Sequence, residues 1–416
     1  MRFVSSCITD IGKKRSNNED WILEWPEKGL YIVADGMGGG KHGEVAAQLT
    51  VDTLERHIIE HYAVIQAFRL ARSPENRQKV LDLIAEGATR ANTAVWREAD
   101  KSGSCGRMGT TLTMLLAIDT EGFVLHVGDS RLYLIRNAVM TQLTTDHTMR
   151  GDYERRYGAA PDGLDGSLSN TLTRAIGLCD TIEVETRNFE IRLNDRFLLC
   201  SDGVHRYFDE ARVAELTLQL AVPGIDALEE KRFLDREIKS MIDAIYKAGA
   251  EDNFSVLLIS AREADEETAA AEKLLDVAGV ARSLTLFSGF DEEQIERLVL
   301  SSEVRAQNKY DILSFPLRPE GELLIMLEGQ VSVLRKSRQI EVLTTGSLIG
   351  EVSFFSGKPM NYTLFVDKPS TFIVVRRSII KELLEESPSA AAKFLWEVCR
   401  IMADQILTSV SHIEKK

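Results

Sequence analysis

The chain has 416 residues, which is too long for one ordinary hydrophobic core, so two or three domains are expected. Its composition, 44% hydrophobic and 27% charged, is that of a soluble globular protein. The formal net charge of −14 disfavours binding to nucleic acid or to an anionic membrane surface.

Neither a membrane span nor a secretory leader is expected. No window approaches about 18 uninterrupted apolar residues, and the N-terminus begins a strand-like stretch without signal-peptide architecture. The five cysteines form no close pair and fit no zinc motif. We therefore expect reduced thiols in a cytoplasmic protein.

The first 262 residues alternate strand-like and helix-like segments. Short runs rich in β-branched and apolar residues predict strands at 30–34, 111–117, 123–127, 132–135, 197–200 and 255–259. Amphipathic periodicity predicts helices at 44–61, 77–99 and 228–248. Helices flanking several strands favour a layered α/β sandwich. Residues 150–169 contain glycines and few apolar side chains, so they predict a long surface loop, and loops of this length in compact domains tend to be functional.

A second region follows an acidic, alanine-rich stretch at 263–280, which is interpreted as a helical linker. From residue 281 to the end, short strands at 323–327, 331–334 and 372–375 with glycine turns predict a small β-barrel or jelly roll. A long amphipathic helix, 389–413, closes the chain. The domains expected are thus 1–262 and 281–416.

Four aspartates lie at the ends of the predicted strands of the first domain: Asp35, Asp129, Asp202 and Asp252. Carboxylates at the ends of buried strands, far apart in sequence, predict one oxygen-rich metal site. Two divalent cations that share and acidify one water can hydrolyse a phosphate monoester. We expect Asp35, Asp202 and Asp252 to hold them, and Asp129 to complete a further site with Asp202.

Blander readings exist for each of these residues. An isolated aspartate after a strand is often a turn residue or a helix cap, and Gly128-Asp129-Ser130 is also a good turn. The less favoured alternative for Arg15 is a plain surface arginine. His126 and His147 are interpreted as structural hydrogen-bonding residues rather than catalysts.

The order of the short motifs makes the metal reading specific. Over residues 1–262 the chain resembles the metal-dependent protein phosphatases of the PPM, or phosphatase 2C, family. The matching motifs, in chain order, are Arg15 with Glu19-Asp20, Ala34-Asp35-Gly36-Met37-Gly38-Gly39, Gly109-Thr110-Thr111, 126–131, Thr145-Asp146-His147, 172–177, Ser201-Asp202-Gly203 and Asp252-Asn253. The resemblance implies an αββα sandwich and hydrolysis of phosphoserine and phosphothreonine in proteins.

The resemblance also implies roles for single residues. Asp35 would bridge two Mn²⁺ or Mg²⁺ ions, with the Gly36 carbonyl on one ion and Asp202 and Asp252 on the other. Asp129 would serve a third, weaker ion. Further roles are implied around the ions: Arg15 would hold the substrate phosphate, and Glu19, Asp20 and Asn253 would support waters and ligands.

Two positions depart from the family pattern. Met37 stands where eukaryotic members often have a histidine that is a candidate general acid, so the chain is similar to the bacterial branch. Arg206 stands four positions after Asp202, where some relatives have an acidic residue that binds the third ion. The third ion is accordingly the least secure of the three.

The C-terminal region resembles cyclic nucleotide-binding domains, on Leu286 to Phe290, 325–333 and 349–353 leading to Gly357-Lys358-Pro359. Glu351 matches the residue that holds the ribose hydroxyl in that family. Met360 replaces the arginine that pairs with the cyclic phosphate, Asn361 follows it, and Tyr310 replaces an early glycine. Binding of cAMP or cGMP is therefore not expected unless Lys358 takes over the pairing. A module for dimerisation or interaction is the alternative.

The sequence thus predicts a cytoplasmic protein serine/threonine phosphatase, controlled or assembled through its C-terminal domain, with a phosphoprotein of a Ser/Thr kinase pathway as substrate. A phosphoprotein-binding scaffold with weak catalysis is the alternative. The last helix carries an apolar stripe that must pack on its own domain or on a partner. We expect a homodimer through that stripe, formed by Ala391, Phe394, Leu395, Val398, Met402 and Ile406.

Overall fold

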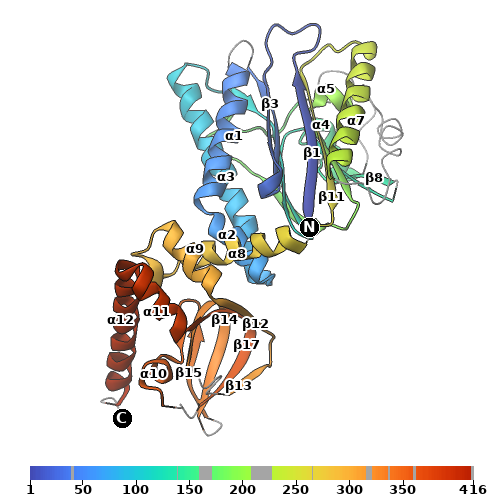
Figure 1. Ribbon diagram of the computed structural model, residues 1–416. Helices are drawn as coiled ribbons and strands as arrows, with labels where there is room; N and C mark the ends of the chain where they lie inside the picture. Colours follow the sequence, from blue (N-terminus) through green and yellow to red (C-terminus); the bar gives the residue numbers. More distant parts are fainter. Residues whose placement is uncertain are drawn as a thin grey trace. The chain divides into compact units, whose positions relative to one another are not determined.

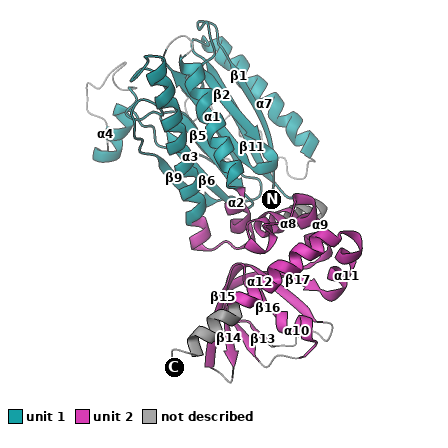
Figure 2. Cartoon of the chain, turned by 90° about the vertical axis from the view of Figure 1, so that its left-hand side faces the viewer, with its two compact units in different colours: residues 1–61, 78–265 teal, residues 62–77, 266–416 magenta. Residues whose placement is uncertain are grey.

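The computed structural model describes residues 1–38, 42–137, 139–158, 171–207, 227–264, 266–314, 321–335, 338–358 and 362–413, and only the backbone of 266–273 and 405–413. The chain divides into two compact units, the first formed by 1–61 and 78–265 and the second by 62–77 and 266–416 (Figure 2). Among the described residues, no helix is long and apolar enough to span a membrane.

Two antiparallel sheets form the centre of the first unit. One has the order β1 (Arg2–Asp10), β11 (Phe254–Arg262), β10 (Arg196–Cys200), β7 (Arg131–Arg136), β8 (Val139–Gln142). The other has the order β2 (Asp20–Trp25), β3 (Leu30–Met37), β5 (Leu112–Ile118), β6 (Glu121–Val127), β9 (Glu185–Glu190), and β4 (Gly109–Thr110) pairs with β3. Buried side chains of both sheets pack face to face, among them Phe3, Phe197 and Leu257 against Tyr31, Leu115 and Val124.

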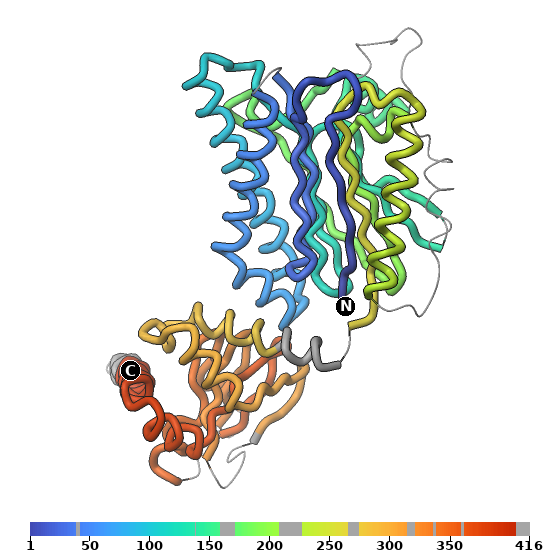
Figure 3. Tube along the Cα trace, turned by 45° about the horizontal axis from the view of Figure 1, so that its top comes forward, coloured from blue at the N-terminus to red at the C-terminus, as the bar shows by residue number. Residues whose placement is uncertain are grey.

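Helices cover both outer faces of this sandwich (Figure 1). Helices α1 (His42–Glu60) and α3 (Pro74–Lys101) lie on the side of the second sheet, and α7 (Ala227–Ala248) lies on the other side, as the trace in Figure 3 also shows. The face of α7 that packs on Leu198 and Leu258 repeats at the 3–4 residue spacing of a helix: Leu234, Ile238, Met241 and Ile245. The predicted αββα sandwich is confirmed.

The loop predicted at 150–169 is wrong over its first part. Helix α4 spans Met149–Tyr157; the side chain of Thr148 caps its start by accepting from the Gly151 amide at 3.1 Å, and Gly158 ends it at φ +82°. Its basic residues Arg155 and Arg156 lie in the last turn, where they favour the helix dipole. The capping residues were present in the sequence, but the low apolar content hid the helix. Residues 159–170 lie outside the described ones.

A six-stranded antiparallel sheet forms the centre of the second unit. Its main path is β12 (Glu303–Gln307), β17 (Thr363–Arg376), β14 (Glu322–Arg335), β15 (Arg338–Thr344), while β13 (Ile312–Ser314) pairs with β17 and β16 (Leu348–Ile349) with β14. Alternate residues of β14 face opposite sides: Leu324 and Met326 enter one apolar cluster, and Leu323, Ile325 and Leu327 enter another.

The two short strands expected at 323–327 and 331–334 are one strand, so the glycine turn predicted between them is wrong. At Gly329 the backbone has φ +111°, and the register between β14 and β17 shifts around this residue. A Cβ atom at Gly329 would lie 2.2 Å from the Ser370 hydroxyl. The glycine therefore marks a bulge inside a strand rather than a reversal of the chain.

Seven described helices belong to the second unit together with this sheet: α2 (Tyr62–Leu70), α8 (Glu266–Arg282), α9 (Glu292–Ser301), α10 (Glu351–Ser356), α11 (Arg377–Glu386), α12 (Pro388–Ile413) and the short η3 (Thr285–Phe287). The stretch expected to be a linker is α8, and its Val277, Ala278 and Ala281 are buried in the core of this unit. It is thus an integral part of the second unit.

Helix α2 comes from the middle of the phosphatase-like sequence, yet it packs in the second unit. The side-chain amide of Gln66 donates to the Leu275 carbonyl at 3.1 Å, and Arg69 pairs with Asp276 at 3.4 Å. The Asn76 amide donates to Glu328 on β14. Residues 62–77 therefore belong to the C-terminal core, although the residues on either side of them belong to the first unit.

The stripe on α12 is covered within its own unit where its side chains are described. Ala391, Phe394 and Val398 are fully buried in the apolar core, and Leu395 and Met402 pack against it. Ile406 lies outside the described side chains. The reason given for a homodimer, an uncovered stripe, therefore does not hold for these five positions.

Candidate active site

Backbone pairing brings the predicted aspartates to one end of the sandwich. Asp20 and Asp35 are register partners at the start of β2 and near the end of β3. Asp202 follows β10 and Asp252 precedes β11, which are neighbouring strands. A Cβ atom at Gly203 would lie 1.9 Å from the Asn253 carbonyl oxygen, so glycine is required where these two turns touch.

Two arginines tie the aspartates together. The Arg15 guanidinium donates to Asp252 at 2.8 Å, and Arg206 pairs with Asp202 and, at 3.2 Å, with Asp252. The charge of Asp202 is one of the causes that raise the pKa of Asp35, so these two carboxyl groups are near neighbours. The structure thus brings Arg15, Asp35, Asp202 and Asp252 into one cluster.

Glu19, Asp20 and Asn253 form the layer behind the cluster. One oxygen of Asp20 accepts from the hydroxyls of Ser201 and Ser255, each at 2.7 Å. The Asn253 side chain accepts from the Glu19 amide at 3.0 Å and donates to two loop carbonyls at 2.9 Å. These bonds fix the loop that carries Arg15 against the turn that carries Asp252, directly before β11.

Burial sets the electrostatics of the carboxyl groups. It raises the pKa of Asp20 to about 7 and that of Asp129 to about 7, with Asp202 as a further cause in both. Burial, followed by the neighbouring carboxylates Asp20 and Asp202, raises the pKa of Asp35 well above its usual range. The pKa of Asp202 is also raised, mainly by burial and against the attraction of Arg206. Such a group of crowded acids favours a bound cation.

The residues present suit a hard divalent cation. The carboxylates of the cluster offer oxygen ligands, and Glu19 Oε1 and Asp20 Oδ1 have no protein hydrogen-bond partner among the described residues although both atoms are buried. A Cβ atom at Gly36 would lie 2.1 Å from the Gly43 carbonyl oxygen, so its backbone needs glycine. As they stand, the described side chains do not enclose an ion with three ligands.

Asp129 lies beside this cluster, on the turn that follows β6. Its carbonyl oxygen lies 3.0 Å from His205 Nε2, and its side chain is buried. The two histidines behind this turn are structural, as expected: His126 Nδ1 lies 2.9 Å from the Thr113 hydroxyl, and His147 Nδ1 accepts from the Gly128 amide at 3.1 Å.

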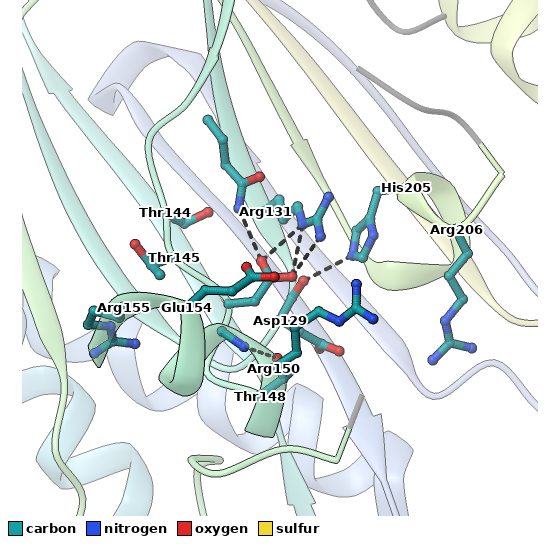
Figure 4. Close-up of a pocket in the computed structure, with 13 residues that line it drawn as sticks. Asp129, Arg131, Thr144, Thr145, Thr148, Arg150, Glu154, Arg155, His205 and Arg206 are labelled. Atoms are coloured by element: carbon teal, nitrogen blue, oxygen red, sulfur yellow. Dashed lines mark hydrogen bonds and ion pairs between the residues drawn. The ribbon is translucent and has the colours of Figure 1, made fainter. Parts of the chain in front are cut away.

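A pocket of about 590 Å³ adjoins Asp129 and Arg206 (Figure 4). Its far wall is helix α4, with Arg150, Glu154 and Arg155, and its floor includes the ion pair of Arg131 with Asp146 at 2.7 Å. The sequence analysis did not identify this wall because α4 was taken for a loop. It also missed Ser201 and Ser255, which nothing in their sequence context distinguishes from strand-end serines.

Comparison with known proteins identifies the first unit. The family model described as protein phosphatase 2C matches residues 12–252. The chain belongs to the protein phosphatase 2C family. A serine/threonine phosphatase, stp, from Listeria innocua is 33% identical over 259 residues, which cover 60% of this chain and 93% of the relative. This phosphatase 2C member is therefore an enzyme, a phosphoric monoester hydrolase.

Solved structures agree with that assignment. The phosphatase PstP/Ppp of Mycobacterium tuberculosis has a TM-score of 0.52 and 25% identity, and the match covers 63% of this chain and all of that one. The catalytic domain of PstP described in complex with two manganese ions has a TM-score of 0.50 and 25% identity, covering 63% of this chain and 99% of that one.

A second family model, the cyclic nucleotide-binding domain, matches residues 311–387. Two positions bear on its ligand. Tyr310, expected from the sequence to stand where that family has a glycine, has φ +77°, a left-handed conformation that glycine adopts more easily. Glu351 begins α10, and burial raises its pKa. Met360 and Asn361 lie outside the described residues.

Proposed function

We propose that this phosphatase 2C member hydrolyses phosphoserine and phosphothreonine in proteins and that two divalent cations, Mn²⁺ or Mg²⁺, occupy its acidic cluster. The observation that carries the proposal is the convergence of Asp35, Asp202 and Asp252, with Arg15 beside them. The Gly36 carbonyl would complete the ligand set. The catalytic domain of PstP, described in complex with two manganese ions, supports two as the number of ions.

The ions would supply an acidified water and positive charge beside the phosphate. The chain's own residues do the rest. Arg15, half exposed, presents a planar donor fork that suits a phosphate. Glu19 and Asp20 retain unpaired buried oxygens that can accept hydrogen bonds from waters around the ions.

Met37 has no proton to give to the leaving oxygen. We infer that the proton comes from water, as expected for the bacterial branch. A third ion on Asp129 and Asp202 would have to share Asp202 with Arg206, so its site is the weakest of the three.

Hydrolysis of p-nitrophenyl phosphate and of a phosphothreonine peptide tests this function. We expect activity that requires Mn²⁺, disappears in excess EDTA, and falls by on the order of 100-fold or more in Asp202→Asn. Asp243→Asn, which changes an exposed aspartate on α7, is the matched control and should retain activity. Undiminished activity of the wild type in EDTA would overturn the two-metal proposal, whereas no activity even with Mn²⁺ would leave the phosphoprotein-binding scaffold.

The second unit would regulate or assemble the enzyme, and the substrate would be a cytoplasmic phosphoprotein made by a Ser/Thr kinase. All five cysteines are free thiols in the structure, which is compatible with a reducing compartment. Segment 62–77 belongs to the second unit, yet it follows α1 directly in the chain, and the first turn of α1 contains Gly43 next to Gly36. This connection supports a regulatory role of the second unit. A change in the C-terminal core could therefore act on the active site along one helix.

A further inference from the structure

Arg206 holds an unusual place in the cluster. It directly follows α5 (Asp202–His205), so it lies one helical turn after Asp202, and its guanidinium contacts two of the three predicted metal ligands. Its side chain is nevertheless 47% exposed. A guanidinium that pairs with both carboxylates offsets part of the charge that a divalent cation would offset.

The same side chain also lines the pocket next to the cluster. In that pocket the guanidinium of Arg131 is already paired with Asp146, to which it donates three hydrogen bonds of 2.7 to 3.2 Å. Arg155 pairs with Asp152 of its own helix, at 3.1 Å. Arg150 of α4 lines the pocket as well, but Arg206 is the described arginine of this lining that also contacts the acidic cluster, and Figure 4 shows it at the pocket's edge.

We propose that Arg206 is a resident counter-charge that competes with divalent cations for Asp202 and Asp252, and that ion binding releases its guanidinium to an anionic group of the substrate in the adjoining pocket. The inference rests on the proposed function, because it takes Asp202 and Asp252 as ligands. It adds a role for a residue of this chain at a position where some relatives have an acid.

The geometry supports such an exchange for two reasons. The backbone of Arg206 is fixed, since its amide donates to the Asp202 carbonyl at 3.1 Å, while 47% of its long side chain is exposed, so the guanidinium can leave the two carboxylates without moving the backbone. The pocket then receives a planar fork suited to a carboxylate or a phosphate group. The anionic group that Arg206 would bind in the pocket is an acidic side chain or a second phosphate next to the phosphoresidue that is hydrolysed.

Calorimetric titration of the full chain with Mn²⁺ tests the first half. Arg206→Ala should bind Mn²⁺ about two- to fivefold more tightly than the wild type, the factor expected from one half-exposed ion pair. Arg206→Lys, which keeps a charge without the fork, should lie between the two. Arg90→Ala, an exposed arginine paired with Glu86 on α3, should bind like the wild type.

Steady-state kinetics tests the second half. Arg206→Ala should raise KM for a phosphopeptide flanked by acidic residues about two- to fivefold, yet leave KM for p-nitrophenyl phosphate nearly unchanged. Opposite signs in metal affinity and peptide affinity are the signature that a purely structural arginine would not give.

Equal or weaker Mn²⁺ binding by Arg206→Ala overturns the competition. An unchanged KM for the acidic peptide overturns the release into the pocket. If the wild type binds no Mn²⁺ at all, the proposed metal chemistry fails with it, and that result is distinct from wild type and variant binding Mn²⁺ equally.

Discussion

At the scale of single residues, the acidic cluster is explained by burial. Asp20, Asp35 and Asp129 lie where water solvates their charges poorly, and each is a neighbour of further carboxylates. Two arginines reduce this repulsion, and they differ in the chain segment that holds each of them. Arg15 comes from a loop that Asn253 fixes, whereas Arg206 comes from the helix that Asp202 begins.

Arg15→Ala should weaken the binding of substrate more than the binding of metal. Loss of a hydrogen bond to a charged phosphate should raise KM for p-nitrophenyl phosphate about tenfold or more. Mn²⁺ affinity, measured by calorimetry, should change less. Arg15→Lys should recover part of the loss because it keeps the charge without the fork. Unaltered KM and kcat in Arg15→Ala would remove this residue from the phosphate site.

Much of this cluster could be predicted from the sequence, because Asp35, Asp202 and Asp252 each lie beside an apolar run. The pairing of Arg206 with Asp202 could not be read from the motif, which only marked a departure. Its spacing of four residues was the available signal, since residues at this spacing meet on a helix. The supporting hydroxyls of Ser201 and Ser255 depend on strand register, which a single sequence does not reveal.

At the scale of elements, prediction succeeded where a strand or helix had its own apolar pattern and failed where end residues decide. Helix α4 is specified by Thr148 and Gly158 rather than by an apolar face. Strand β14 continues through Gly329 because its neighbour β17 accepts a bulge there. Both errors came from reading glycines as turns.

Helix α7 has an electrostatic anchor as well as an apolar one. Glu230 is fully buried and pairs with Arg196 at 3.2 Å and with Arg262, which belong to β10 and β11. Glu230→Gln should lower the free energy of unfolding of the first unit by about 3–5 kcal/mol, because two guanidinium groups lose their buried counter-charge. Urea denaturation followed by fluorescence measures this, with Asp243→Asn of the same helix as control. A loss below about 1 kcal/mol would show that water already solvates the pair.

At the scale of the whole molecule, the sequence predicted two domains and both fold classes. It could not predict that residues 62–77 leave the first unit. Ile65 and Phe68 of α2 are fully buried, but an amphipathic helix does not state which core its apolar face will join. That choice depends on α8 and on Gln66 and Arg69, whose partners are some two hundred residues away.

The C-terminal unit should not bind cyclic nucleotides with micromolar affinity. Met360 stands where the resembled family has its arginine, and a buried phosphate without its charged partner loses several kcal/mol. Calorimetric titration of the full chain with cAMP and with cGMP should show no binding heat in that range. A low-micromolar isotherm would mean that another group, with Lys358 as the first candidate, provides the pairing.

The homodimer predicted through the apolar stripe of α12 loses its basis at the five described positions, which pack in their own unit. A contact between two copies is expected instead on the opposite face of the helix. There Ala392, Trp396, Cys399 and Ala403 are exposed at spacings of four, three and four residues, and Trp396 is 72% exposed. Light scattering at micromolar concentration should report a particle with twice the mass of one chain. For the Trp396→Lys variant it should report the mass of a single chain. A monomeric wild type would end this reading of the helix.

Because residues 62–77 belong to the second unit, the two units are difficult to express as separate fragments. The chain passes between the two units three times, after residues 61, 77 and 265, so neither unit is one continuous segment. A catalytic fragment ending near 262 would retain α2 but strip it of α8, exposing Phe68 and Ile65 to solvent and promoting aggregation. Proteolysis after 265 would leave two pieces still held together by α2. Replacing 62–77 with a short flexible connection offers the cleaner way to separate them.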